Sequence, residues 1–115
     1  MKPINQIENA VKAFSVKYPE LKSVAPLYVL ALCAILRHVG DLQFLLGIPC
    51  LSTRILKIER AVFPVDVSNL SGEEFAEIYQ HLIIKCAENI ARFRPNKSDS
   101  DLFKDLLRDE SDAVW

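Results

Sequence analysis

The longest apolar run of the chain, residues 24–39 (VAPLYVLALCAILRHV), limits the fold more than any other stretch. Its first charged residue is Arg37, so a helix over this run is apolar on nearly every side. Such a helix must be buried on most of its faces. The apolar part, residues 24–36, is well short of the roughly 20 residues that cross a bilayer. The run therefore predicts the central helix of a protein core and no membrane anchor.

The size and composition of the chain suit one folded domain around that helix. The chain has 115 residues, of which 50% are hydrophobic and 25% charged, with only three glycines. This balance is typical of globular proteins, and the length allows one hydrophobic core. The formal net charge of −1 provides no global attraction to nucleic acid or to anionic membranes.

Charge is unevenly distributed along the chain. Residues 1–62 carry most of the basic side chains, and the remainder carries most of the acidic ones. This asymmetry fits two arrangements, a basic binding face with an acidic tail or a scatter of charges over solvated surfaces.

The three cysteines indicate free thiols in a reducing compartment. Cys33, Cys50 and Cys86 are odd in number, far apart and set among apolar residues. A secreted disulfide scaffold would carry an even and denser set. The first 14 residues also lack the apolar stretch of a signal peptide. We therefore expect a cytoplasmic protein.

Helical periodicity recurs on both sides of the central run. Apolar residues at steps of three and four predict a helix over residues 3–17, with Glu8 and Lys12 as an ion pair one turn apart. A longer helix is expected to begin after residue 71. Ser71 and Glu74 form a capping box, S-x-x-E, at its start.

Two shorter helices are expected between these elements, over residues 42–46 and 53–62. Ser52 can cap the second of them. Residues 63–70 (FPVDVSNL) form a connector in which a strand of two or three residues could occur. The apolar and the basic side chains of the 53–62 helix line different faces: Ile55, Ile58 and Val62 on one, and Arg54, Lys57 and Arg60 on another.

Together these segments predict an all-α fold, a compact bundle of five or six short helices around a buried central helix at about residues 24–39. Residues 1–95 are expected to form the helical domain. Residues 96–115 then comprise a polar joint, a short amphipathic helix and an acidic tail.

Residues 42–61 contain one candidate nucleic-acid site. Gly47 lies between a short helix and a helix that carries Arg54, Lys57 and Arg60. This arrangement resembles the DNA-reading part of small bacterial repressors, whose second helix enters the major groove. The resemblance implies that these three cations contact bases and phosphates.

Two residues depart from that helix-turn-helix pattern. Gln43 stands where a small residue is usual, and Thr53 stands where a buried aliphatic residue is usual. The alternative is two ordinary helices of a bundle with a basic, solvated face.

The C-terminal segment is the candidate partner-binding region. A short helix here would present apolar residues with the spacing of a ligand that binds as a helix in a groove. It would pack against its own domain, a foreign protein or a second copy of the chain, because a short helix is unstable alone. The apolar residues concerned are Leu102, Phe103, Leu106, Leu107 and Trp115.

No pattern in the sequence indicates a metal site, a cofactor or catalysis. The cysteines and histidines lack zinc-ligand spacing. A glycine-rich phosphate loop is absent, and no cysteine has a basic setting that would activate it. We therefore expect a non-enzymatic helical protein-interaction module, acting as an adaptor, an inhibitor or a small subunit. Its partner would be another protein or a second copy, with no membrane. The alternative is a small DNA-binding regulator with a degenerate helix-turn-helix at 42–61.

Overall fold

The computed structural model describes residues 2–38 and 42–92. Helices account for 78% of these residues, and no strand occurs among them. The predicted all-α class is therefore confirmed. The elements in chain order are α1 (Pro3–Lys17), a 3₁₀ helix η1 (Pro19–Val24), α2 (Ala25–Arg37), α3 (Leu42–Leu46), α4 (Thr53–Ala61) and α5 (Gly72–Arg92).

The number of helices is not confirmed as five or six. Four helices, α1, α2, α4 and α5, have nine residues or more, whereas α3 has only five. The last helix expected, over residues 101–109, lies outside the described residues, as does the whole of the predicted second region, residues 96–115.

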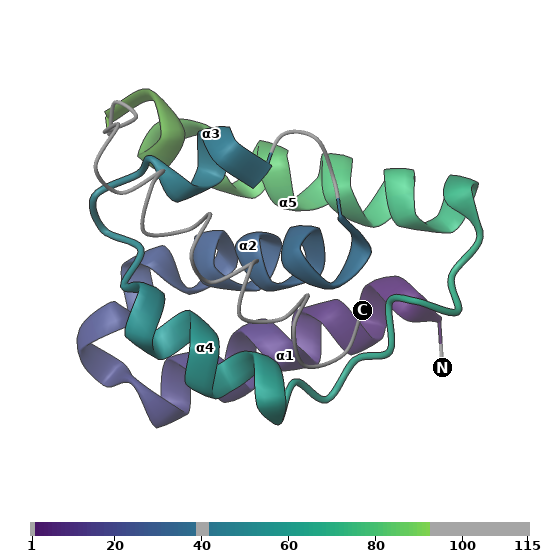
Figure 1. The fold of residues 1–115 in the computed structure, drawn as a ribbon, viewed down its shortest axis with the longest axis horizontal. Coiled ribbons are helices and arrows are strands. Elements are labelled where there is room, and N and C mark those ends of the chain that lie inside the picture. Colours follow the sequence, from purple (N-terminus) through teal and green to yellow (C-terminus); the bar gives the residue numbers. More distant parts are fainter. Residues whose placement is uncertain (1, 39–41, 93–115) are drawn as a thin grey trace.

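Helix α2 forms the centre of the fold, as its composition predicts. It packs against α1, α3, α4, α5 and η1, and Figure 1 shows it between α5 on one side and α1 with α4 on the other. Ten of its 13 residues are buried, including Leu30, Leu32 and Ile35. The stretch Pro19–Arg37 is long and apolar enough to cross a membrane by length and composition alone, and 56% of an 18-residue window within it is buried inside this fold.

The two ends of α2 differ from the sequence prediction. The helix begins at Ala25 and not at residue 24, because η1 continues to Val24, which occupies the N-cap position without a side-chain hydrogen bond. At the other end the backbone of His38 adopts the left-handed conformation, with φ of 57°. Its N–H donates to the carbonyl groups of Ala34 and Ile35 and so closes the last turn. Residue 39, the predicted end of the helix, lies outside the described residues.

Helix α5 begins as the capping box predicts. The N–H of Ser71 donates to Oε1 of Glu74 at 3.1 Å, and the N–H of Glu74 donates to Oγ of Ser71 at 3.1 Å. The helix buries one face against the core, through Phe75, Ile78, Leu82 and Cys86. Helix α1 has the predicted bounds, and its buried face consists of Ile7, Ala10 and Phe14.

The connector between α4 and α5 is held by a side chain and not by strand pairing. Nη1 of Arg37 donates to the carbonyl oxygens of Val67 at 2.9 Å and of Leu70 at 2.8 Å. The same guanidinium lies 5.3 Å from the centre of the Phe75 ring. Because these carbonyl groups accept hydrogen bonds from the C-terminal end of α2, the connector needs no partner strand.

Candidate interaction surface

The apolar stripe of α4 remains largely outside the core. Ile58 and Val62 are 49% and 62% exposed, and Ile55 is half-buried. The helix instead buries Leu56, which is 0% exposed. Ile55, Ile58 and Val62 therefore share one face, as the spacing predicts, but the described residues cover only Ile55, and only in part. We call these three residues the α4 stripe.

The N-terminal end of α4 is fixed by two hydroxyl groups. Oγ of Ser52 accepts a hydrogen bond from the N–H of Ile55 at 3.4 Å, which confirms the predicted cap. The hydroxyl of Tyr28, on α2, accepts from the N–H of Ser52 at 2.7 Å and donates to the carbonyl of Cys50 at 2.8 Å. Burial is the main cause of the raised pKa of Tyr28, so this phenol stays protonated at neutral pH. The start of α4 is thus anchored to the central helix.

The second half of α4 is fixed by Glu59. Its Oε1 accepts hydrogen bonds from Nζ of Lys17 at 2.6 Å and from the hydroxyl of Tyr18 at 2.6 Å. The hydrogen bond to Glu59 raises the pKa of Tyr18 and the pKa of Lys17. Glu59 follows Leu56 by three residues, so both lie on the side of α4 that faces the body of the protein. Their positions set the rotation of α4 and turn the α4 stripe outward.

Two of the three predicted DNA-contacting cations lie beside the α4 stripe. Arg54 and Lys57 are exposed, and Arg54 precedes Ile58 by one helical turn. Arg60 is half-buried. The exposed face of α4 is therefore apolar along the stripe and basic along one edge.

A hollow extends the apolar surface from α4 to α1. It has a volume of about 200 Å³ and is lined on the α4 side by Val62 and Pro64, and on the α1 side by Ala13 and Lys17. A second hollow of about 310 Å³ shares Ala13 and Pro64 with the first. Sequence reasoning missed these hollows, because their walls come from separate segments and no local pattern marks them.

The helix-turn-helix candidate departs from the usual geometry. Helix α3 has five residues, and residues 47–52 connect it to α4, whereas the motif has a turn of three or four residues. Two apolar residues of this connection, Ile48 and Leu51, are 0% and 5% exposed, whereas Cys50 is half-buried and Pro49 is exposed. This connection therefore contributes two side chains to the core.

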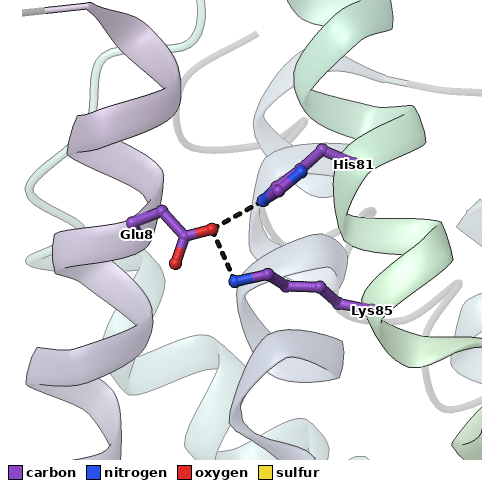
Figure 2. A network of polar contacts seen from close by, with 3 residues as sticks. All are labelled: Glu8, His81 and Lys85. Carbon is purple, nitrogen blue, oxygen red and sulfur yellow. Dashed lines mark hydrogen bonds and ion pairs between the residues drawn. The ribbon is translucent and has the colours of Figure 1, made fainter.

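A separate polar cluster joins α1 to α5 (Figure 2). Oε1 of Glu8 lies 2.6 Å from Nε2 of His81 and 2.5 Å from Nζ of Lys85. The hydrogen bond from Lys85, followed by that from His81, lowers the pKa of Glu8. Glu8, expected to pair with Lys12, thus forms a contact between two distant helices. Each of the three side chains is about one-third exposed, so the contact lies near the surface. We call these three residues the Glu8 cluster.

The cysteine thiols are poor nucleophiles. Burial raises the pKa of Cys33 and of Cys86 to about 12, and it also raises the pKa of Cys50. These thiols stay protonated at neutral pH, and the thiolate is the reactive form. In the part of the chain that the structure describes, no three His, Cys, Asp or Glu residues are placed to hold a metal ion.

The predicted partner-binding residues of the tail, Leu102, Phe103, Leu106, Leu107 and Trp115, lie outside the described residues. The chain matches no protein-family model, no curated protein and no solved structure.

Proposed function

We propose that this chain is a non-enzymatic protein-interaction module that binds an acidic amphipathic helix of a partner along α4. The observation that carries the proposal is the α4 stripe, whose residues Ile58 and Val62 are 49% and 62% exposed. A helix that presents branched apolar side chains to water gains from covering them, because burial of apolar surface is favourable.

The surroundings of the stripe support a helical and acidic ligand. Leu56, Glu59 and the Tyr28 contact hold α4 in place, so binding orders little of this surface. The ligand would place its apolar side chains against Ile58 and Val62, as helix-in-groove ligands do. Arg54 and Lys57 along one edge favour carboxylates there and disfavour a basic ligand.

The exposure of Arg54 and Lys57 is the observation that favours the second candidate, a DNA-binding regulator. Three features support the first candidate over it. Ile58 and Val62 occupy the exposed face that would meet phosphates, Arg60 is half-buried, and the connection between α3 and α4 places Ile48 and Leu51 in the core.

We also propose that the module works in the cytoplasm. Free cysteines at positions 33, 50 and 86 suit the reducing cytoplasm. There the chain would act as an adaptor, an inhibitor or a small subunit, completed by another protein or by a second copy. A bundle of five or six helices would follow if residues 101–109 add a last helix to those described.

A titration with a synthetic peptide tests the proposal on the full chain. The peptide is fluorescein-labelled, has an unrelated sequence, and carries leucines at helical spacing beside aspartates. A matched peptide has lysine at every aspartate position. We expect saturable binding of the acidic peptide alone, weakened about tenfold or more by Ile58→Asp and by Arg54→Glu.

The matched control is Ile84→Asp, because Ile84 on α5 is 69% exposed and lies outside the α4 stripe. It adds the same charge and should leave the affinity unchanged. Equal loss in Ile84→Asp, or equal binding of the lysine peptide, would contradict the proposal. Binding of a duplex DNA of random sequence at physiological salt, with affinity falling steeply as salt rises, would instead establish the DNA-binding candidate.

A further inference from the structure

The chain itself contains a segment with the chemistry that the α4 stripe suits. In a helix over residues 101–109 (DLFKDLLRD), Asp101, Asp105 and Asp109 recur every four residues and would share one side. The adjoining side would carry Leu102 and Leu106. Residues 101–112 contain five carboxylates and two cations, so this segment is acidic overall.

We propose that residues 101–109 dock as a helix on the α4 stripe of the same molecule and so regulate partner binding there. This inference rests on the proposed function, because it assigns the tail as an internal competitor for the same surface. The segment would cover Ile58 and Val62 with its leucines, and its aspartate side would face Arg54 and Lys57.

The position at which α5 ends makes an intramolecular contact feasible. Nδ2 of Asn89 donates to the carbonyl of Ser23 at 3.1 Å, so the last turn of α5 lies beside the start of α2. The N-terminal end of α4 lies near the same end of α2, through the contact between Ser52 and Tyr28. Figure 1 shows the end of α5 and the start of α4 at one end of the molecule.

The intervening chain is long enough for this path. Residues 93–100 separate α5 from the proposed helix and span about 26 Å when fully extended. The longest dimension of the protein is 37 Å, and the path joins two elements at one end of it. A short connection of this kind gives the tail a high effective concentration at α4.

The contact would make the binding surface available only in a fraction of molecules. A partner then binds with an affinity reduced by that fraction, and a change that releases the tail strengthens binding. Charge complementarity between aspartates and Arg54 also makes the closed state sensitive to salt.

Hydrogen exchange followed by mass spectrometry tests the contact on the full chain. Amides of residues 102–107 should exchange at a rate at least about tenfold lower than in a synthetic peptide of residues 93–115. This protection should disappear in Ile58→Asp and in Leu106→Asp. It should persist in Ile84→Asp and in Ser111→Asp, which add the same charge outside the proposed contact.

Three outcomes would overturn the inference. They are exchange in wild type as fast as in the peptide, protection that survives Ile58→Asp, and protection that falls on dilution. The last outcome would show that the segment binds a second copy of the chain and not its own molecule.

The peptide titration separates this inference from the proposed function. Leu106→Asp should bind the acidic peptide several-fold more tightly than wild type, while Ser111→Asp should bind it as wild type does. Equal binding by wild type and Leu106→Asp overturns the internal competition but leaves the interaction surface established. If neither form binds the peptide while residues 102–107 of wild type are protected from exchange, the proposed function is overturned, and with it the regulatory role of the tail.

Discussion

Helices α2 and α4 both carry apolar residues at helical spacing, yet the fold treats them differently. Ten of the 13 residues of α2 are buried, whereas in α4 only Leu56 is buried. The central helix packs against all the other α-helices described, while the main contact of α4 is with α2 alone. An apolar stripe is thus covered only where neighbouring elements surround it, and the stripe of a peripheral helix can remain a surface for another molecule.

The largest expected effect is at the centre of α2. Leu30→Ala removes a side chain that is 0% exposed and should lower the free energy of unfolding by about 2–5 kcal/mol. Urea denaturation followed by circular dichroism at equilibrium measures the change. A loss below about 1 kcal/mol would mean that α2 is not the centre of the core and would remove the contrast with α4.

The contact between the two helices should have the next largest effect. Tyr28→Phe leaves the N–H of Ser52 and the carbonyl of Cys50 without the phenol hydroxyl. We expect a loss of about 1–3 kcal/mol, because partly buried backbone groups lose their hydrogen-bond partner. Hydrogen exchange should locate the loosening at the start of α4 and spare α5. A uniform increase in exchange over both helices would show that Tyr28 does not anchor α4 in particular.

The Glu8 cluster between α1 and α5 should contribute less to the free energy of unfolding, and its contribution should depend on pH. The pKa of Glu8 lies below its ordinary value of 4.5, so the folded state binds fewer protons than the unfolded state in this range. Its contribution is present above about pH 4.5 and is lost as pH falls through the lowered pKa. Glu8→Gln should cost about 0.2–1 kcal/mol at neutral pH.

Urea denaturation of wild type and Glu8→Gln between pH 3 and pH 7 measures this contribution, and the difference between them should shrink toward the acidic end. Glu88→Gln on the exposed side of α5 is the control for loss of one carboxylate. If the free energies of unfolding of wild type and Glu8→Gln differ by the same amount across that range, the role of the carboxylate in the Glu8 cluster is contradicted.

The smallest expected effect on stability is in the α4 stripe. In the Leu106→Asp variant, which lacks the proposed tail contact, Ile58→Ala should change the free energy of unfolding by less than about 0.5 kcal/mol, as surface substitutions do. The same urea experiment measures it beside Leu30→Ala. A loss of about 2 kcal/mol or more in that variant would show that Ile58 is covered by something other than the tail, such as a second copy of the chain, and would remove the contrast with α2.

Patterns within one segment of the sequence predicted the elements that depend on residues close together in the chain. The all-round apolarity of residues 24–36 predicted a buried helix, and the side chains of Ser52, Ser71 and Glu74 predicted two helix starts that the structure confirms. Capping bonds form between residues close in sequence, so a single segment contains the information.

Contacts between residues far apart in the sequence determined how the helices are oriented and joined. The outward rotation of α4 follows from Leu56 in the core and from Glu59 bound to Lys17 and Tyr18, which lie about 40 residues earlier in the chain. The pairing of Glu8 with Lys85 and the contact of Arg37 with the connector likewise join distant residues. Spacing in the sequence shows that Ile55, Ile58 and Val62 share a face. It cannot show whether that face is covered, because covering depends on which other elements fold against it.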